Sequence, residues 1–273
     1  MTEGTLRKMP AELVDPVHYR LPVGEELIDL NPLLGQEISL VYSGRIFCIE
    51  CGRKTNKSIN QGYCFPCLRR LAACDTCIVK PELCHYHEGT CREPQWGETH
   101  CMQPHVVYLA NSSGLKVGIT RKTQVPTRWI DQGAIQALPI VEVDTRLQSG
   151  LIETVLKGTV NDRTDWRRML KGGQTEIDLK SEWDQLRKTS EALLTDCQSK
   201  FGSAAVRLKG QEQVTRISYP VLHYPDKIKT YNFDKERVVK GTLEGIKGQY
   251  LILDLGVLNI RKFAGYEISF TVC

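Results

Sequence analysis

The sequence lacks the segments that would carry it into or across a membrane. It has no run of about 20 apolar residues, the length that spans a bilayer, and its most apolar stretch, residues 250–258, is interrupted by Asp254. Residues 1–16 are polar and contain prolines, so they do not form the basic start and apolar core of a secretory signal. We therefore expect a soluble, cytoplasmic protein with no membrane partner.

The sequence also lacks the common nucleotide-binding motifs. Neither the G-x-G-x-x-G pattern of dinucleotide-binding folds nor a P-loop occurs. An RNA-modifying enzyme that depends on such a cofactor therefore has no motif in its favour. The formal net charge is only +4 over 273 residues, which by itself indicates little about partners.

Cysteine, by contrast, is concentrated in one region. Nine of the eleven cysteines lie between residues 48 and 101, and because disulfides are rare in the cytoplasm we expect reduced thiols that bind metal. The first four form two C-x-x-C pairs separated by twelve residues, Cys48 with Cys51 and Cys64 with Cys67. Two such turns make the tetrahedral sulfur site that Zn²⁺ prefers. The pattern resembles a zinc ribbon and predicts a structural zinc site.

The rest of this region offers five thiols and three imidazoles, more than a second zinc ion needs. Cys74 and Cys77 form a third C-x-x-C pair, which we expect to anchor a second zinc site. Its remaining ligands are left open among Cys84, His87, Cys91 and Cys101. An iron–sulfur cluster held by four thiolates is the alternative. His85 and His100 are expected beside the metal ligands or at the surface.

Basic residues gather at several points along the chain. Such groups suit contacts with phosphates, although solvated surface charge explains any single one equally well. Nucleic acid, either DNA or RNA, is therefore an expected partner. The groups contain Arg53, Lys54, Lys57, Arg69, Arg70, Arg121, Lys122, Arg128, Arg163, Arg167, Arg168 and Lys171.

After the cysteines the sequence changes to a regular pattern of strands and helices. Residues 105–110 and 115–120 are short apolar strands on either side of the turn sequence NSSG, which predicts a hairpin. A helix is expected near residues 126–130, and another from about residue 149, where apolar residues recur at helical spacing. Residues 105–172 are therefore expected to form one small α/β domain.

This segment resembles the GIY-YIG nuclease domain, in which two hairpin strands carry the name motifs and later helices carry an arginine and a glutamate. The first motif corresponds to residues 106–108 (VVY) and the second to residues 116–118 (KVG), with lysine where the family usually has tyrosine. Residues 128–129 (RW) match the family's arginine–tryptophan pair, and Glu153 matches its metal-binding glutamate. Gln132 stands where a histidine often follows the arginine.

The resemblance implies a Mg²⁺-dependent phosphodiesterase that acts on nucleic acid. Phosphodiester cleavage needs a metal at a non-bridging oxygen, a cation for the developing charge and a group that orients water. Glu153 would hold Mg²⁺, Arg128 would stabilise the charge and Tyr108 would orient the nucleophile. Lys116 would act as a base only if Arg121 and Arg128 lower its pKa, and otherwise as a phosphate clamp. The alternative is a non-catalytic DNA- or RNA-binding zinc protein on the same scaffold.

Runs from most of the chain are also similar to a bacterial family known as domain-of-unknown-function family 2797. The matching runs are CGRKTNKS, GYCFPC, KVGITR, RWIDQGA and GIKGQYLILD. This resemblance spans nearly the whole chain and implies no activity.

The remaining sequence predicts a helix and a C-terminal β domain. Apolar residues recur along one stripe of residues 178–200, which predicts a single amphipathic helix. Five or six short strands beyond residue 201 predict a small antiparallel barrel or a curled sheet, to which residues 38–48 could add a strand. The expected strands are 206–208, 214–218, 238–243, 249–255, 257–260 and 266–272.

We therefore expect an α+β multidomain protein, with its oligomeric state left open. The expected units are an N-terminal β segment (1–47), a cysteine-rich metal-binding region (48–104), a GIY-YIG-like domain (105–172), an amphipathic helix linker (173–200) and a C-terminal β domain (201–273).

Overall fold

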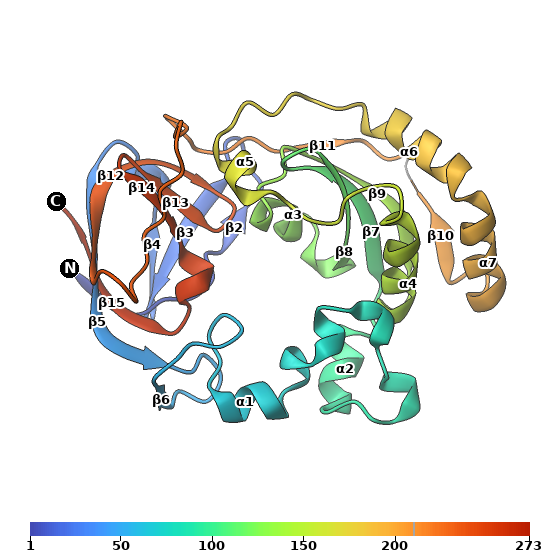
Figure 1. Cartoon of the computed structure of the whole chain (residues 1–273), viewed down its shortest axis with the longest axis horizontal. Coiled ribbons are helices and arrows are strands. Elements are labelled where there is room, and N and C mark those ends of the chain that lie inside the picture. Colours follow the sequence, from blue (N-terminus) through green and yellow to red (C-terminus); the bar gives the residue numbers. More distant parts are fainter. Residues whose placement is uncertain (210) are drawn as a thin grey trace.

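The computed structural model describes residues 1–209 and 211–273 and has a mixed α+β architecture with three antiparallel sheets. Figure 1 shows the strands of the two chain ends in one half of the molecule and the hairpin strands with their helices in the other. The cysteine-rich region lies along both halves. It is tied to each, because Ser58 Oγ donates to the Ala264 carbonyl at 3.0 Å and Arg146 donates to the Ile78 carbonyl at 2.6 Å.

The first sheet, called here the terminal sheet, contains strands from both ends of the chain. In spatial order they are β1 (Thr2–Thr5), β15 (Tyr266–Val272), β5 (Glu37–Phe47), β12 (Val238–Lys247), β13 (Tyr250–Leu253) and β14 (Gly256–Asn259), with β6 (Lys54–Thr55) beside β5. β5 pairs antiparallel with β12 on one side and β15 on the other. The strand expected at residues 38–48 is therefore confirmed, and it joins the N-terminal segment to the C-terminal strands.

The expected C-terminal barrel or curled sheet is wrong. In the described part of the chain, the terminal sheet ends at β1 on one side and β14 on the other, and no sheet closes on itself. Two of the expected strands form as β10 (Val206–Leu208) and β11 (Thr215–Arg216), but both pair with β9 (Gln136–Val143) of the second sheet. Of the described residues beyond 201, four strands therefore belong to the terminal sheet.

The second sheet, called the hairpin sheet, is built around β7 (His105–Asn111), which pairs with β8 (Leu115–Arg121) and β9. The expected hairpin is confirmed. Every residue of β7 is buried because both faces are covered. Tyr108 packs into a core shared with the terminal sheet, whereas Val107 and Leu109 pack into a second core under helices. This alternation is that of a central strand between two layers.

Helices flank the hairpin sheet. They are α3 (Thr127–Asp131), α4 (Arg146–Leu156), α6 (Leu179–Thr189) and α7 (Glu191–Phe201), whereas α5 (Trp166–Leu170) packs through Met169 and Leu170 against the terminal sheet. α4 begins with a capping box, in which Thr145 Oγ1 accepts from the Gln148 amide and Gln148 Oε1 accepts from the Thr145 amide. The single helix expected over residues 178–200 is instead two helices, because Ser190 has φ −109° and ψ 10°, outside helical geometry.

Shorter elements complete the chain. The third sheet contains β2 (Ala11–Glu12), β3 (His18–Val23) and β4 (Glu26–Asp29), and the cysteine-rich region contains α1 (Phe65–Arg70) and α2 (Pro94–His100). The 3₁₀ turns are η1 (Asn31–Leu33), η2 (Ala72–Cys74), η3 (Thr76–Ile78), η4 (Pro81–Leu83), η5 (Tyr86–Glu88), η6 (Lys122–Gln124) and η7 (Ile260–Phe263). None of the helices in the described residues has the length and apolar character needed to cross a membrane.

Candidate functional site

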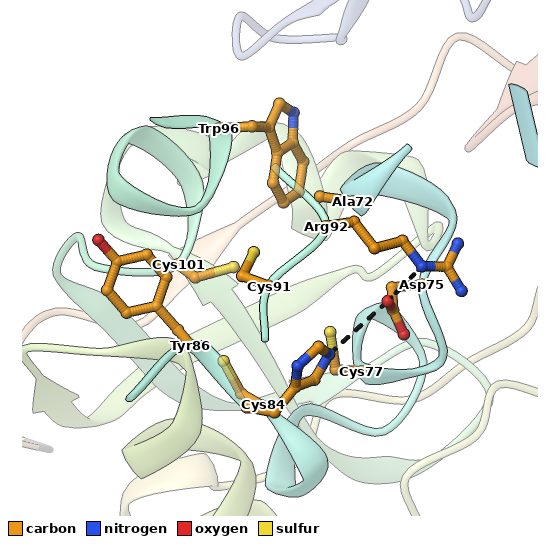
Figure 2. A pocket seen from close by; sticks show the side chains of 10 residues that line it. Ala72, Asp75, Cys77, Cys84, Tyr86, Cys91, Arg92, Trp96 and Cys101 are labelled. Atoms are coloured by element: carbon orange, nitrogen blue, oxygen red, sulfur yellow. Dashed lines mark ion pairs between the residues drawn. The ribbon is translucent and has the colours of Figure 1, made fainter. Parts of the chain in front are cut away.

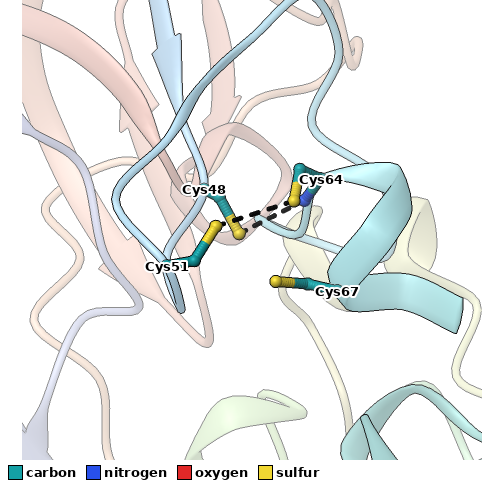
Figure 3. Close-up of side chains that lie close together, drawn as sticks. All are labelled: Cys48, Cys51, Cys64 and Cys67. Carbon is teal, nitrogen blue, oxygen red and sulfur yellow. Dashed lines mark hydrogen bonds between the residues drawn. The ribbon is translucent and has the colours of Figure 1, made fainter. Parts of the chain in front are cut away.

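The cysteine-rich region contains two separate groups of thiols (Figure 2 and Figure 3). The two predicted C-x-x-C pairs meet in a four-cysteine cluster of Cys48, Cys51, Cys64 and Cys67. Their sulfur atoms lie within 4.8 Å of one another, and the Cys51 and Cys64 Sγ atoms are 3.7 Å apart. A tetrahedral zinc site with Zn–S bonds of about 2.3 Å has sulfur atoms about 3.8 Å apart. The four-cysteine cluster is therefore compatible with one zinc ion.

Backbone amides favour the thiolate form of Cys48 in the four-cysteine cluster. The Cys64 amide donates to Cys48 Sγ at 3.3 Å. Burial raises the pKa of Cys48, but hydrogen bonds from the amides of Cys51, Cys64 and Glu50 outweigh this effect and lower the pKa to about 6. Because zinc binds the thiolate rather than the thiol, these amides prepare the Cys48 sulfur for metal, whereas burial raises the pKa of Cys67.

The second group of thiols surrounds a small space of about 10 Å³, called here the thiol cavity (Figure 2). The potential ligands that line it are Cys77, Cys84, Cys91, Cys101, Asp75 and His85. Asp75, Cys77 and His85 place one donor atom each within 4.8 Å of one another. A space of this size holds about one water-sized sphere, so it can accommodate a single ion and no larger ligand.

Two of the expected ligands for the second site lie elsewhere. Cys74 packs against the buried cysteines of the four-cysteine cluster, and His87 is exposed and does not line the thiol cavity. The backbone explains the position of Cys74. Cys74 is the last residue of η2 and Cys77 lies in η3, and Asp75 between these two turns is extended, with φ −68° and ψ 156°. The structure thus separates the pair that the C-x-x-C spacing joins.

A larger cavity of about 550 Å³ lies where β8, α3 and α4 meet the cysteine-rich region. We call it the basic cavity because cations outnumber carboxylates in its lining. The cations are Lys8, Lys116, Arg121, Arg128, Arg146 and Arg261, and the carboxylates are Asp131, Glu153 and Asp162. Lys8 Nζ is 2.5 Å from Asp131 Oδ2, so this carboxylate is already neutralised. The basic cavity is therefore suited to an anionic ligand.

Three of the four residues assigned to catalysis by the GIY-YIG resemblance line it: Lys116, Arg128 and Glu153.

Tyr108, the fourth, lies behind the wall of the basic cavity. Its side chain is fully buried, and its ring packs over Gly118, its partner on β8, where a Cβ would lie 2.7 Å from Tyr108 Oη. Gln132 connects Tyr108 to Arg128. With its amide oxygen toward Arg128, Gln132 accepts from Nε at 3.2 Å and Nη2 at 3.1 Å and donates to Tyr108 Oη at 2.8 Å. Tyr108 therefore acts on the basic cavity through Gln132 and Arg128.

Lys116 is a buried cation whose side chain reaches the basic cavity. Burial is the largest cause and Arg128 the second of a pKa for Lys116 that is lowered to about 8, and Glu153 and Asp162 oppose this shift. The sequence expectation named Arg121 and Arg128, whereas in the structure burial is the largest cause and Arg128 the next. A group with a pKa near 8 is partly deprotonated near neutral pH, so Lys116 can exchange a proton there.

Glu153 lies on α4 and is 8% exposed. Lys157, one helical turn later, has its Nζ 3.5 Å from Glu153 Oε2 and 3.3 Å from Asp162 Oδ2, so it bridges the two carboxylates. Burial raises the pKa of Glu153, and Lys157 opposes this effect. Carboxylate oxygens are ligands of Mg²⁺. Within the described ranges, however, the groups of three or more close metal donors lie in the cysteine-rich region and not at Glu153.

Five charged residues of the basic cavity carried no functional signal in the sequence: Lys8, Asp131, Arg146, Asp162 and Arg261. Arg146 occupies the first turn of α4, where nothing in the helical pattern marks it. Asp162 lies after α4, outside the expected elements, and Arg261 comes from η7 near the C-terminus. Only the folded chain brings these positions to β8, so no local spacing could have identified them.

A second hollow of about 790 Å³, called the adjoining groove, continues from the basic cavity. The two share Asn60, Gln61, Lys116, Asp131, Gln132 and Arg261. The far part of the adjoining groove is lined by Arg163 and Lys262 and by the rings of Trp166 and Tyr250. These rings are nearly parallel at 8°, with centroids 5.7 Å apart. The combined surface is elongated and carries both positive charge and aromatic rings.

The family model described as "Protein of unknown function (DUF2797)" matches residues 35–268. The matched range runs from the turn before β5 into β15 and contains the four-cysteine cluster, the thiol cavity and most of the basic cavity lining. No curated protein and no solved structure matches the chain. The GIY-YIG resemblance therefore has no support in these comparisons.

Proposed function

The chain belongs to the DUF2797 family, and we propose that it is a zinc-containing, metal-dependent phosphodiesterase that acts on nucleic acid through the basic cavity. One observation carries the proposal: Lys116, Arg128 and Glu153 belong to three different elements, yet all line one cavity. Phosphodiester cleavage needs cations and a carboxylate at one point, because charge develops on the phosphate as the nucleophile attacks.

Arg128 is the residue that would bind the phosphate in its transition state. Two of its N–H groups donate to Gln132, which fixes the plane of the guanidinium. A guanidinium has five N–H donors, so donors remain for a non-bridging oxygen. The Tyr108 hydroxyl is a positioning group in this arrangement, because it reaches Arg128 only through Gln132. Preorganised donors of this kind need no rearrangement as charge develops.

Glu153 is the residue that would hold a divalent cation, with Asp162 as a second carboxylate. Such a cation supplies neutralisation of charge at a non-bridging phosphate oxygen. Carboxylates are the ligands that Mg²⁺ and Mn²⁺ favour, and both side chains line the basic cavity. Lys157, which bridges them, would move toward solvent when the cation binds.

Lys116 has two roles open to it. With a pKa of about 8, its neutral form could accept a proton from the attacking water, while its charged form could hold a phosphate oxygen. A base role predicts a cleavage rate that increases with pH up to about 8, because the neutral fraction of Lys116 increases over that range. A clamp role predicts the opposite change.

The adjoining groove favours a polymer over a small phosphate ester. It extends the basic cavity by a surface with Arg163, Lys262, Trp166 and Tyr250. Cations that follow a phosphate backbone, together with aromatic rings that contact bases, are typical of surfaces that bind single-stranded nucleic acid. A small ester would fill the basic cavity and leave this second surface without a role.

The test is cleavage of single-stranded DNA, duplex DNA and RNA with Mg²⁺ or Mn²⁺. Glu153→Gln should lower the rate by about 10²-fold or more while leaving substrate binding nearly unchanged, because the metal acts mainly in the transition state. Glu236→Gln, an exposed carboxylate outside the basic cavity, is the matched control and should cleave like the wild type. A wild type that cleaves none of the substrates, or a Glu153→Gln variant that cleaves normally, would remove the enzymatic assignment.

A non-catalytic nucleic-acid-binding protein is the second candidate. One observation favours it: Lys157 already forms ion pairs with both carboxylates that would hold the cation. In that case the protein binds but does not cleave, and its affinity for duplex DNA falls with salt by a log–log slope of about 0.9 for each neutralised phosphate. Absence of binding at low salt would exclude both candidates.

A further inference from the structure

We propose that the thiol cavity binds a second zinc ion through Cys77, Cys84, Cys91 and Cys101. The proposal does not depend on the phosphodiesterase function. Cys77 lies in η3, Cys84 follows η4, Cys91 precedes α2 and Cys101 follows it, and Figure 2 shows the four sulfur atoms around the same small space. Four thiolates around one ion make the closed tetrahedral site that structural zinc prefers.

The packing around this space is built for close approach of the sulfur atoms. Gly97 of α2 lies against it, and a Cβ at this position would be 2.8 Å from Tyr86 Cδ2 and 3.3 Å from Cys91 Sγ. Any larger residue would therefore push Cys91 or the Tyr86 ring out of place. The Cys84 and Cys101 side chains also interact with each other, which places their sulfur atoms near one another.

Asp75 and His85 line the same cavity, but their polar atoms have protein partners. Arg92 Nε lies 2.6 Å from Asp75 Oδ2 in an ion pair, and His85 Nδ1 lies 2.7 Å from Thr90 Oγ1. His85 Nε2 is also 3.6 Å from Asp75 Oδ2. Because these contacts already satisfy the two side chains, we assign them to the support of the thiols rather than to the metal.

The charge of the site is consistent with this assignment. Four thiolates and one Zn²⁺ carry a net double negative charge, which is costly to bury without a cation nearby. Arg146 is that cation, because it is half-buried and lies close enough to Cys77, Cys84 and Cys101 to interact with their charges. Its Nη2 donates to the Ile78 carbonyl, whereas its buried Nε has no partner among the described atoms.

The site also bears on the basic cavity, because α4 packs directly on the turn between the ligands. A Cβ at Gly150 would lie only 2.5 Å from the Glu82 amide nitrogen of η4. Arg146 and Glu153 are on the same helix as Gly150. The zinc site proposed here would thus fix the position of α4 relative to η4. It would thereby also fix the positions of the Arg146 and Glu153 side chains in the basic cavity.

The first test is the zinc content of the full chain purified under reducing conditions without chelator. The wild type should hold two zinc ions, and Cys84→Ser or Cys101→Ser should hold one. Cys74→Ser, His87→Ala, Asp75→Asn and His85→Ala should each keep two. A wild type with one zinc ion, or loss of one ion in Cys74→Ser or His85→Ala, would overturn the ligand assignment.

A second test avoids variants that fail to fold. Wild-type protein is alkylated before and after treatment with a strong chelator, and each cysteine is followed by mass spectrometry. Cys77, Cys84, Cys91 and Cys101 should react at least tenfold faster after chelation, and exposed Cys273 should react equally in both states. Unchanged reactivity of Cys84, Cys91 and Cys101 while Cys77 is protected would instead assign the metal to the Asp75 group.

Discussion

The cysteine-rich region and the hairpin sheet differ in the interactions that stabilise each of them. β7 of the hairpin sheet is buried along its whole length between two hydrophobic cores. The cysteine-rich region buries few apolar side chains beside its thiols, and Phe65, Val79 and Leu83 are 58%, 78% and 52% exposed. Burial of apolar surface stabilises the hairpin sheet, whereas the cysteine-rich region has the ligands for stabilisation by metal. The basic cavity lies between them, so its shape depends on both.

The largest expected effect is that of Cys64→Ser, which removes one ligand of the four-cysteine cluster. Structural zinc contributes about 10–16 kcal/mol in zinc-finger peptides, so residues 48–71 should unfold while the hairpin sheet stays folded. Hydrogen exchange should show loss of protection in α1 and retained protection in β7 and β9. Cys197→Ser, at a buried cysteine outside the cysteine-rich region, is the control and should keep all zinc. Equal loss of protection in both regions would show that they do not fold independently.

Lys116→Met tests the charge buried at the boundary between the two regions. The shift of the Lys116 pKa to about 8 from 10.5 corresponds to a cost of about 3 kcal/mol for keeping the side chain charged in the folded state. Below pH 8 the folded protein bears this cost, and it disappears as pH increases from 8 to 10.5, because the unfolded chain binds the proton more strongly. Lys116→Met should therefore have a larger free energy of unfolding than the wild type at pH 7. The difference in free energy of unfolding between the two proteins should become smaller by pH 10.

Denaturant unfolding of both proteins at several pH values measures this gap. Lys188→Met, which replaces an exposed lysine on α6, is the control and should show no such pH dependence. A Lys116→Met variant that is less stable at pH 7 would indicate that the charge is stabilised by partners in the basic cavity.

The smallest effect is expected for Gly150→Ala, which tests how tightly the two regions are joined. The added Cβ would lie 2.5 Å from the Glu82 amide and 2.7 Å from the Pro81 carbonyl carbon, and overpacking of this kind costs about 1–3 kcal/mol. Thermal unfolding should show the loss. Gly158→Ala just beyond α4, where the nearest atom is 3.4 Å away, should be close to neutral. Equal stability of the two variants would mean that α4 is not held by η4.

The predictions that succeeded rested on residues close together in the chain. The C-x-x-C pairs at Cys48 and Cys64 each form one turn, and the hairpin follows from two apolar strands and a tight turn between them. Such patterns predict local structure because the interacting atoms are only a few residues apart. The predictions that failed depended on contacts between residues far apart in the chain. The strands at residues 206–208 and 214–218 formed, but they pair with β9, which lies more than 60 residues earlier.

The sequence by itself determined that the chain has a four-cysteine cluster, a hairpin and a helix that carries Glu153, because spacing and periodicity decide these locally. Only the tertiary structure decided that Cys74 faces the four-cysteine cluster while Cys77 faces the thiol cavity. The extended residue Asp75 lies between η2 and η3, so the two cysteines point to different sites. It also decided that Arg261 meets Lys116 across one cavity. Side-chain positions of this kind depend on how distant elements pack. Hydrophobic burial drives that packing, and because it is non-directional, a local sequence pattern does not specify which elements meet.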